Sequence, residues 1–442
     1  MSEATNAFDC DVLVVGGGPS GSTAATLLHR RGYRVIQLEK DRHPRFHIGE
    51  SLLPCNLPIM EELGVLEKVR ALGVLKLGAD FPSGEGNYQT FHFRRALGHS
   101  PPHAFQVKRE EFDQMLFEHA RESGVDAREG VKVGKVDVQG VDKVIAEAHD
   151  ADGNALTIRA RYFVDASGRD TLLGNTLKLK RKNDKHQSAA IFAHFRGVLH
   201  RPGEDAGNIS IYNFPHGWCW FIPLRDGVMS VGCVCWPEYL KQRRGRNEAF
   251  LLEALQTMPD AWARMTAAEM ISEVRVTGNY SYTCSRMAGP GWVMVGDAYA
   301  FVDPVFSSGV YLAMHSGKQA AALVDSILHE PAREAALQAA FTRRIRRGIR
   351  VFSWFIYRFN SPVMRGLFAS PRNVWRVEDG VISMLAGDVF DSAAVMRRLH
   401  FFKVIYAIGG VLNLRRFIGD LINRKKQARY AFSGGNTPVD PA

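Results

Sequence analysis

The glycine-rich stretch between residues 11 and 39 constrains the fold of this chain more than any other feature. An apolar run at residues 12–15 leads into GGGPSG at residues 16–21, a helical pattern follows, and a second apolar run ends at Glu39. This order predicts strand, tight turn, helix and strand, the context in which such a glycine motif binds a dinucleotide. A glycine-rich turn without a ligand is the alternative, and the acid at the end of the second strand disfavours it.

Each part of this motif has a mechanical role. Gly16 makes the turn, Gly18 lets the backbone approach a pyrophosphate, and Gly21 lets the helix pack closely on the strand. The start of the helix offers unpaired N–H groups and the positive end of its dipole to the phosphates. Glu39 is placed to accept hydrogen bonds from ribose hydroxyls. The sequence therefore predicts a bound dinucleotide here.

Length and composition bound the remaining possibilities. The 442 residues suffice for two domains or more. The first ten residues show no signal-peptide pattern, and the longest apolar run, 401–414, is too short for a membrane span and contains Lys403. The six cysteines lack metal-ligand spacing, and Cys233 and Cys235 are predicted to be small hydrophobes on one strand face. We expect a soluble, reduced, cytoplasmic protein without a metal site.

The formal net charge of +10 is concentrated after residue 341. A solvated helical face is the favoured interpretation of this basic region. A docking surface for an acidic carrier protein or an anionic membrane surface is the sharper alternative, and nucleic acid is the weakest because no recognisable module accompanies the charges. The basic pairs are Arg343-Arg344, Arg346-Arg347, Arg397-Arg398, Arg415-Arg416 and the run Arg424-Lys425-Lys426.

Further along the chain, residues 49–51 open a helical pattern that continues to Leu63, and residues 71–93 read as short strands and turns. Lys76 lies within the apolar stretch 74–81. By alternation it faces opposite to Leu75 and Leu77, so the pattern alone predicts a solvent-facing lysine.

The middle of the chain changes from mixed elements to strands. Residues 105–118 predict a strand end and an amphipathic helix, and strands follow near 131–136, 144–148 and 156–160. Residues 162–168 read as a buried strand ending in small residues, which leave room for a ligand. The alternating aromatic and aliphatic residues of 188–237 predict an antiparallel sheet that carries the substrate pocket.

A second glycine-containing strand end follows near residue 296. Residues 292–295 predict a strand that runs into Gly296-Asp297, and residues 310–328 predict a helix. Asp297 can accept from the hydroxyls of a sugar-alcohol chain, although a plain turn is the alternative. The segment Ser307-Ser308-Gly309 opens the helix, so its free N–H groups predict an anion site.

Five motifs together resemble the flavin-dependent halogenase family, within the broader FAD monooxygenase-like flavoproteins. They are GGGPSG (16–21), the lysine of VLKLGADF (Lys76), DASGRD (165–170), WCWFIP (218–223) and GDAYAFVDPVFSSG (296–309). The first motif and Gly296-Asp297 are shared by many FAD enzymes, whereas W-x-W-x-I-P and F-x-x-P-x-x-S-x-G are far more specific to halogenases. Their occurrence together with Lys76 reverses the expectation of a solvent-facing lysine.

The resemblance implies a two-component reaction. A separate flavin reductase supplies FADH2, which uses O2 to oxidise chloride or bromide held near the backbone amides of Ser308 and Gly309. The resulting hypohalous acid travels through a tunnel to a catalytic lysine, Lys76, beside the substrate. These roles agree with physical chemistry, because helix N–H groups suit a halide and burial in an apolar tunnel favours a neutral, nucleophilic amine.

The resemblance also assigns the remaining site residues. Those expected to bind FAD are Gly16, Gly18, Pro19, Ser20, Gly21, Glu39, Lys40, Arg45, Ser51, Arg109, Val133, Gly296, Asp297 and Gly309. Those expected to line the pocket or tunnel are Trp218, Trp220, Ile222, Pro223, Phe301, Pro304, Phe306 and Ser307. For the two tryptophans, a role as ordinary core aromatics is the alternative.

Tryptophan-type members carry a glutamate two residues before the position of Ser308, and this chain has Phe306 there. We therefore expect a phenol, pyrrole or indole-type substrate other than tryptophan, possibly tethered to an acidic carrier protein. An FAD-dependent monooxygenase or geranylgeranyl-reductase-like oxidoreductase is the alternative, since it would share the FAD motifs without needing Lys76. A redox-inactive binding module is disfavoured because the FAD elements look complete.

The predicted fold is α/β. A Rossmann-like FAD-binding domain of three layers (β/β/α) occupies residues 1–182 and returns at 276–340. An antiparallel substrate sheet is inserted at 183–275, and a C-terminal helical region fills 341–442.

Overall fold

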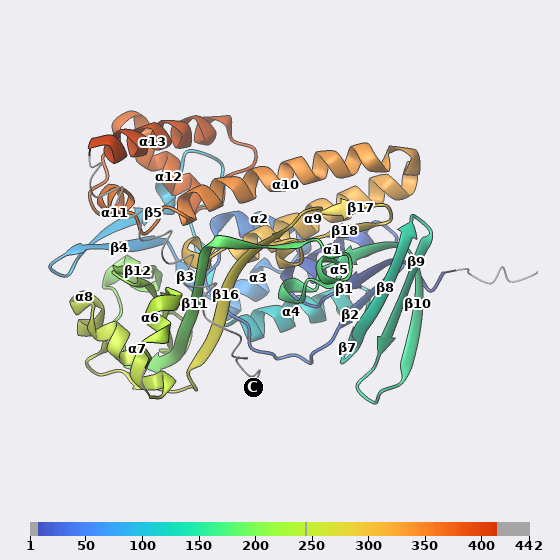
Figure 1. The fold of residues 1–442 in the computed structure, drawn as a ribbon, viewed down its shortest axis with the longest axis horizontal. Coiled ribbons are helices and arrows are strands. Elements are labelled where there is room, and N and C mark those ends of the chain that lie inside the picture. The colour runs from blue at the N-terminus through green and yellow to red at the C-terminus, as the bar shows by residue number, and fades with distance from the viewer. Residues whose placement is uncertain (1–7, 244, 413–442) are drawn as a thin grey trace, which may run out of the picture.

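The computed structural model describes residues 8–243 and 245–412, which are built around two large sheets (Figure 1). The first sheet has the order β17-β18-β10-β1-β2-β7, with β9 added to β10 and β8 added to β9. Its strands are β1 (Cys10–Val15), β2 (Val35–Glu39), β7 (Asp126–Glu129), β8 (Lys132–Gly140), β9 (Lys143–His149), β10 (Ala155–Asp165), β17 (Ala288–Gly289) and β18 (Trp292–Met294).

The centre of the first sheet is parallel. β1 lies between β2 and β10 and is parallel to both, while β7 and β18 extend the parallel part on either side. The apolar run of β1 is buried, as expected for a parallel strand covered on both faces. Because parallel strands end at one edge, the turn after β1 and the small residues after β10 lie together there, as predicted for a ligand-binding edge.

Three helices pack together beside this sheet: α1 (Pro19–His29), α4 (Arg109–Glu122) and α9 (Ser308–His329). α1 contacts both α4 and α9, so it lies between segments that are far apart in the sequence. Gly317 of α9 permits this close approach, because a Cβ atom there would overlap the carbonyl oxygen of Ser20 in α1. The helix expected after the glycine motif and the helix expected at 310–328 are both confirmed.

The second sheet has the order β19-β16-β11-β14-β13-β12-β4-β5, with β15 on β11. The antiparallel sheet predicted for residues 188–237 is confirmed by the antiparallel pairs β11–β14, β14–β13 and β13–β12. Its strands are β4 (Gly78–Gly84), β5 (Asn87–His92), β11 (Lys180–Arg196), β12 (Ile209–Phe214), β13 (Gly217–Pro223), β14 (Met229–Cys235), β15 (Glu269–Met270), β16 (Arg275–Cys284) and β19 (Ala300–Phe301).

This sheet draws strands from outside the segment 183–275. β4 and β5 come from the first segment of the expected FAD-binding domain, and β19 comes from its return segment. The two sheets are therefore interleaved along the chain. The domain limits at 182, 275 and 340 stay a prediction.

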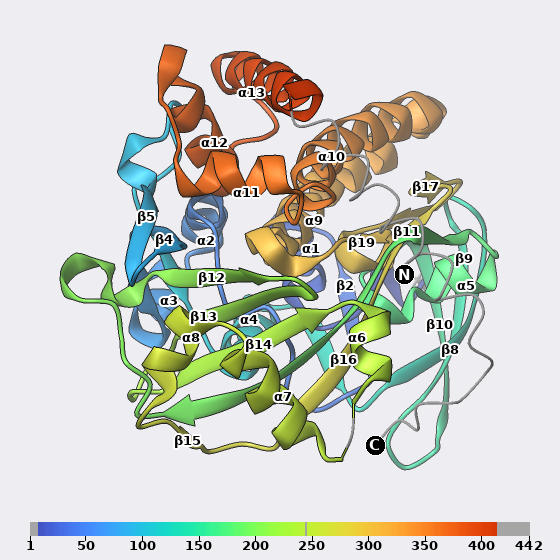
Figure 2. The same cartoon turned by 60° about the vertical axis from the view of Figure 1, so that its left-hand side comes forward.

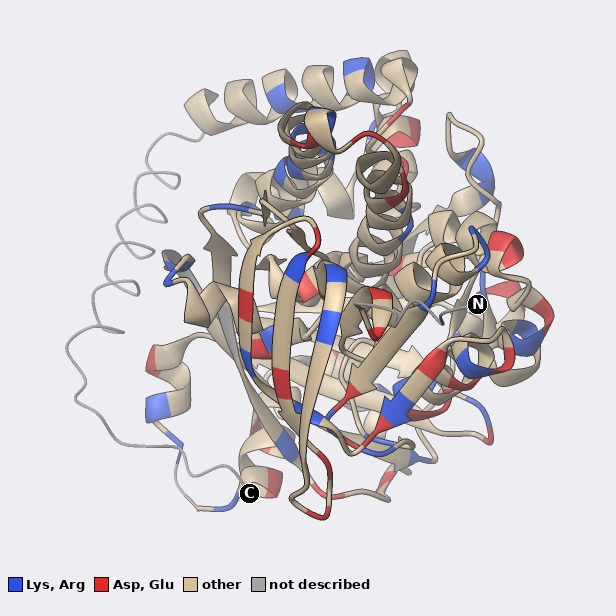
Figure 3. Ribbon diagram, turned by 90° about the vertical axis from the view of Figure 1, so that its right-hand side faces the viewer, with Lys and Arg blue, Asp and Glu red and all other residues tan. Residues whose placement is uncertain are grey.

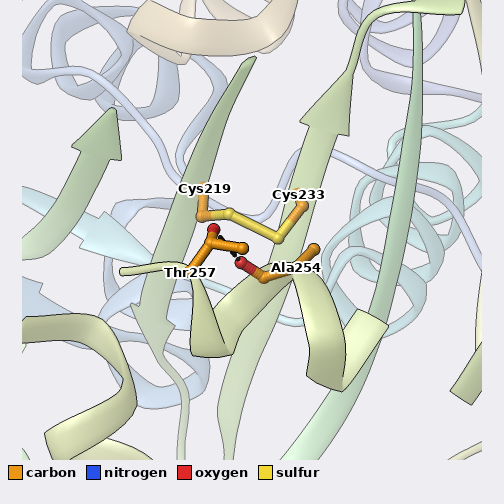
Figure 4. Close-up of a disulfide and its surroundings, with 4 residues drawn as sticks. All are labelled: Cys219, Cys233, Ala254 and Thr257. Atoms are coloured by element: carbon orange, nitrogen blue, oxygen red, sulfur yellow. Dashed lines mark hydrogen bonds between the residues drawn. A yellow bond between two sulfur atoms is a disulfide. The ribbon is translucent and has the colours of Figure 1, made fainter. Parts of the chain in front are cut away.

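A second hydrophobic core lies between β11–β14 and the helices α6 (Pro237–Lys241), α7 (Asn247–Gln256) and α8 (Pro259–Trp262). Here a disulfide joins Cys219 of β13 to Cys233 of β14, beside Ala254 and Thr257 at the end of α7 (Figure 4). Cys233 and Cys235 are both buried in β14, as expected. The expectation that the cysteines are reduced is wrong for the disulfide pair, because β13 and β14 place two cysteines directly opposite each other.

The segment after Gly49 differs from its prediction. Ser51 and Leu52 are extended, because Ser51 forms a bridge to Gln106 and the N–H of Leu52 donates to the carbonyl of Phe105. The helical part begins only with η1 (Pro54–Asn56) and α2 (Leu57–Leu63), followed by α3 (Leu66–Leu72). The short strands β3 (Val74–Lys76) and β6 (Ala104–Gln106) pair beside it.

The predicted C-terminal helical region is confirmed. It consists of α10 (Glu334–Ile356), α11 (Pro362–Ala369), α12 (Val377–Leu385) and α13 (Ala393–Leu412). Figure 2 shows these helices gathered on one side of the molecule, above strands β12–β14. Of the basic pairs, those at 343–347 lie on α10 and those at 397–398 on α13, whereas 415–416 and 424–426 fall outside the described residues. No helix in the described ranges is long and apolar enough to cross a membrane.

Candidate active site

The glycines of the turn after β1 have two different roles: some allow close backbone packing, and one faces the ligand site. Gly16 has φ +119°, and a Cβ atom there would overlap the carbonyl oxygen of Ala166. A Cβ atom at Gly21 would overlap the carbonyl oxygen of Gly16. Within the part of the chain that the structure describes, the only atom within 4 Å of a Cβ built on Gly18 is Nη2 of Arg45, 3.7 Å away. Open space therefore lies above Gly18, where the motif needs room for a pyrophosphate.

Gly18 forms part of a large pocket with an empty volume of about 1480 Å³, its open mouth included. One wall comes from the helix start at Pro19 and Ser20, and another from residues 45–51. The aromatic side chains of β13 and the segment 301–313 complete the lining. The pocket thus joins the edge of the first sheet to the face of the second.

Glu39 is almost fully buried at the end of β2 and fixes the glycine turn. Its Oε2 accepts from the N–H of Gly17 at 2.6 Å and from Nη2 of Arg45 at 3.2 Å. Its Oε1 accepts from the N–H of Asp41 at 3.0 Å. The carboxylate also lines the pocket, so the remaining acceptor capacity of its oxygens is available to a ribose.

Two further basic residues predicted to bind FAD are held at the pocket by acids. Nζ of Lys40 lies 2.6 Å from Oδ2 of Asp170. Arg109 makes a two-pronged hydrogen bond to Asp113, at 2.8 and 2.9 Å, and donates to the carbonyl of Ile48 at 2.8 Å. Arg109 thereby anchors the extended segment that leads to Ser51.

The structure brings most of the predicted FAD residues to this pocket. The lining includes Gly18, Pro19, Ser20, Glu39, Lys40, Arg45, Ser51, Arg109, Asp297 and Gly309. The pocket lining does not include Gly16, Gly21 or Gly296, which instead shape the backbone behind it. Val133 is not brought to the pocket: it is buried in β8, opposite Ala148 of β9.

The substrate sheet contributes an aromatic wall. Trp218, Trp220 and Ile222 lie at alternate positions of β13, so they share one face, and all three line the pocket. The two indole rings are 5.7 Å apart, and Nε1 of Trp220 donates to Oγ of Ser230 at 3.1 Å. Pro223 lies outside this face and does not line the pocket.

The opposite wall is the start of α9. Ser307 adopts a left-handed conformation with φ +56°, and the helix begins at Ser308. No atom of residues 8–243 or 245–412 lies within 4 Å of a Cβ built on Gly309, which lines the pocket together with Phe301, Pro304 and Ser307. The first N–H groups of a helix have no acceptor within it and carry its positive end. Desolvation raises the pKa of the nearby Asp297 to about 6.

Phe306 faces away from the pocket. Its ring is buried and lies 5.3 Å from the ring of Phe359 and 6.2 Å from that of Phe368, measured between centroids. The residue that distinguishes this chain from tryptophan-type members therefore packs against the C-terminal helical region.

Lys76 is buried, and the expectation from alternation alone is wrong. Its exposed fraction is 1%, whereas that of Leu75 is 50%. Nζ donates to Oγ of Ser51 at 2.9 Å and to the carbonyl of Leu52 at 3.0 Å. The centroid of the Phe93 ring lies 5.3 Å from Nζ, and no carboxylate among the described residues lies within 4.0 Å of it. Burial lowers the pKa of Lys76 to about 7.

Lys76 does not itself line the large pocket, but Ser51 does. Ser51 is therefore a residue that lines the pocket and whose hydroxyl accepts a hydrogen bond from the lysine amine. A second cavity, with an empty volume of about 960 Å³ including its opening, lies against Leu75 and Leu77. Since these leucines alternate with Lys76, the second cavity lies on the opposite face of the strand from the lysine side chain.

Several pocket residues were missed by the sequence reasoning. Ser167, Arg169 and Asp170 line the pocket, and so do His47 and Glu50. The signal for the first three was present, because DASGRD directly follows a buried parallel strand, as the glycine motif does. Glu50 had no such signal: it lies 2.9 Å from Nε2 of His194, a residue on the distant β11.

Comparisons with known proteins agree with this geometry. The family model described as FAD binding domain matches residues 9–354. A tryptophan 2-halogenase from Chondromyces crocatus is 39% identical over 72% of this chain, which spans 61% of that relative's length. A 1H-pyrrole-2-carbonyl-[peptidyl-carrier protein] chlorinase from Pseudomonas fluorescens is 30% identical over 86% of this chain and 90% of its own length.

A solved structure shows the same architecture. The myxobacterial chondrochloren halogenase CndH, described as a variant of FAD-dependent halogenases, superposes with a TM-score of 0.75 and 31% identity. The match covers 90% of this chain and 97% of that one. The residues that line the large pocket all lie within the range 9–354 that matches the FAD binding domain model.

Proposed function

Because this chain belongs to the flavin-dependent halogenase family, we propose that it installs chlorine or bromine on an electron-rich aromatic ring through Lys76. It is an FAD-dependent enzyme of the oxidoreductase class, and halogenation is the activity of its family. The observation that carries the role of Lys76 is its position. Its amine is fully buried, has no carboxylate partner among the described residues, and donates to Ser51, a residue that lines the FAD-type pocket.

The residues of the pocket fit FAD. Gly18 leaves open space in front of the N-terminus of α1, where a pyrophosphate would meet free N–H groups and the positive end of the dipole. Glu39, Arg45 and Arg109 supply polar groups along the same wall. When bound and reduced, FAD supplies the electrons with which O2 oxidises a halide to hypohalous acid, and a flavin reductase is the proposed source of the reduced form.

The start of α9 is the proposed halide site. A halide has no directional lone pair, so it suits the cluster of N–H groups at a helix N-terminus. Gly309 keeps this place open, because no atom of the described residues lies within 4 Å of a Cβ built there. The left-handed Ser307 turns the backbone so that the N–H groups of Ser308 and Gly309 begin the helix at the pocket.

Trp218, Trp220 and Ile222 exclude the organic substrate from the flavin. Their side chains form a continuous apolar wall on one face of β13, and the hydrogen bond to Ser230 fixes the orientation of the Trp220 ring. A small, neutral hypohalous acid can pass where an aromatic ring cannot. The wall therefore favours halogenation at a distance over direct oxygen transfer.

Lys76 is the proposed acceptor of the hypohalous acid. With a pKa of about 7, its amine is neutral in a large fraction of molecules at neutral pH. The two N–H bonds of the neutral amine satisfy Ser51 and the carbonyl of Leu52, which leaves the nitrogen lone pair free. The hydroxyl of Ser51 lies on the path from the pocket and can donate to the arriving acid.

The second cavity lies on the face of β3 opposite to Lys76, so the aromatic substrate is proposed to reach the amine from the face of β3 to which the Lys76 side chain points. Relatives named for tryptophan and for a carrier-bound pyrrole both match this chain. We propose a small phenol, pyrrole or indole, free or tethered to an acidic carrier protein.

The test is a reconstituted reaction with purified protein, FAD, a flavin reductase, NADH, O2 and bromide. Phenols, pyrroles, indole and tryptophan are supplied, and products are read by mass for the bromine isotope doublet. Lys76→Met is compared with Lys135→Met, which removes an exposed lysine from β8. We expect the doublet with the wild type and Lys135→Met and its loss in Lys76→Met, with oxygen consumption retained.

Two outcomes would contradict the proposal. A product that gains oxygen instead of bromine would identify a monooxygenase. A doublet that persists undiminished in Lys76→Met would remove the lysine from the mechanism while leaving the halogenase activity in place.

A further inference from the structure

The outer face of α13 is an exposed apolar stripe in the C-terminal helical region. One face of the helix is buried against the neighbouring helices, with Phe402 5.2 Å from the ring of Phe355 and Tyr406 donating to Ser361. The other face exposes Phe401, Val404, Ile408 and Val411 by 44, 45, 55 and 68%. A helix that is apolar on all sides is typical of a buried position, so we expect another molecule to bind this exposed face.

The stripe extends beyond the helix to Trp375. This tryptophan is 73% exposed, and its ring lies 6.0 Å from that of Phe401. Trp375 and Arg376 both have positive φ, 52° and 60°, in the turn before α12. Such backbone costs free energy and is found where a side chain must be presented. A large exposed aromatic beside an exposed apolar helix face marks an interaction surface.

The charges on α13 itself are of one sign. α13 contains Arg397, Arg398 and Lys403 and no acidic residue, and the uppermost helix in Figure 3 accordingly shows blue and no red. The acids at the start of α12, Glu378 and Asp379, are buried and paired with Arg95. By sequence, the 30 residues that follow α13 carry six Lys or Arg and two Asp.

We infer that this surface docks on an anionic lipid membrane, with Trp375 and the α13 stripe in the interface and the basic side chains at the headgroups. Peripheral helices combine apolar and aromatic residues with flanking Lys or Arg in this way, and Trp prefers the membrane–water interface. A second copy of the chain fits poorly, because its matching face would bring the same positive charge. This inference does not depend on the halogenation chemistry.

The experiment is flotation of the full chain with vesicles. Vesicles of phosphatidylcholine with about 30% phosphatidylglycerol are compared with pure phosphatidylcholine at about 0.1 M NaCl, conditions in which surface charge acts over about 10 Å. Ile408→Asp and Arg397→Glu test the apolar and basic parts. Ile271→Asp, at an exposed isoleucine near β15, and Arg347→Glu, on α10, are matched controls. Thermal melting confirms that each variant is folded.

We expect the wild type to float with the anionic vesicles and to bind neutral ones at least tenfold more weakly. Since one basic residue near an anionic surface contributes about 1 kcal/mol, Arg397→Glu lowers the partition coefficient about fivefold or more. Ile408→Asp lowers it at least as much, and the controls change it less than twofold. Brominated lipids quench tryptophan fluorescence in the wild type, and this quenching falls in Trp375→Phe.

Three results would overturn the inference. The first is no flotation of the wild type, with light scattering showing a dimer that Ile408→Asp dissociates, because the stripe would then be a self-interface. The second is no flotation together with binding of an acidic carrier protein that Arg397→Glu abolishes. The third is flotation unchanged in Ile408→Asp and Arg397→Glu, because another part of the chain would then hold the membrane.

Discussion

Replacing Lys76 by methionine should change how the stability of this protein depends on pH. Methionine has a similar length but no charge, so it can fill the same space without the cost of desolvating an ammonium group. Lys76 is 1% exposed, and two uncharged acceptors are its hydrogen-bond partners. Burial lowers its pKa from 10.5 to about 7. The substitution therefore removes a group that titrates differently in the folded and unfolded chain.

The sign and size of the effect follow from proton linkage. Between about pH 7 and about pH 10.4 the unfolded chain carries a proton on Lys76 that the folded chain does not, so the free energy of unfolding rises with pH by about 1.4 kcal/mol per pH unit. Below about pH 7 both states are protonated and this contribution is constant. At neutral pH the full cost of the lowered pKa is about 5 kcal/mol.

The assay is urea unfolding of the wild type and Lys76→Met at about pH 6, 7.5 and 9.5, followed by circular dichroism. Over the upper two values the wild type should gain about 3 kcal/mol relative to Lys76→Met. Lys135→Met, which removes a lysine with a side chain 69% exposed, should show no such change relative to the wild type. Parallel pH profiles for the wild type and Lys76→Met would refute the reasoning, because the amine would then titrate as an exposed lysine does.

Three further predictions concern the pocket and the second sheet. Gly21→Ala should lower the free energy of unfolding, measured in urea, by about 1–3 kcal/mol, since the added Cβ overlaps a backbone carbonyl. Gly309→Ala should leave the free energy of unfolding unchanged but weaken FAD binding, measured by fluorescence quenching. Ser51→Ala should lower the yield of brominated product per O2 consumed, because Lys76 loses one of its two acceptors. Reduction of the Cys219 disulfide, which spans 14 residues, should lower the free energy of unfolding by about 3 kcal/mol in matched urea curves with and without reductant.

The first sheet and its ligand edge could be predicted because the signals are local. Val12–Val15, the glycine turn and Glu39 form one contiguous strand–turn–helix–strand unit, and its geometry follows from the residues within it. The start of α9 could be predicted for the same reason, since Ser307 and Gly309 mark a helix N-terminus directly after a strand end. The local structure of such a motif is determined by residues within the motif itself, so it can be predicted without knowing the rest of the fold.

The second sheet could be predicted only in part, because its strands come from distant segments. The alternation of aromatic and aliphatic residues predicts strands β11–β14. No sequence pattern near residues 78–92 indicates that β4 and β5 join the same sheet through β12. The Cys219–Cys233 disulfide depends on the register between β13 and β14, which a one-residue slip would destroy. The scattered spacing of the cysteines suggested that they are reduced, but the pairing register of β13 and β14 determines which two sulfur atoms form a disulfide.

Lys76 shows why alternation can fail at a buried position for which a functional role is proposed. The rule that strand lysines face solvent assumes that one face of the strand is wet and the other is packed. β3 has three residues, and its outward leucine opens on a cavity while its lysine points into the protein. The acceptors that make this tolerable, Ser51 and the carbonyl of Leu52, lie about 25 residues earlier in an extended segment that a helical pattern concealed. An exposed lysine would not carry the free-energy cost of about 5 kcal/mol that burial of the Lys76 amine imposes on the folded protein. The buried lysine therefore serves a purpose other than stability. The neutral amine that burial creates is the property that a relay of hypohalous acid requires.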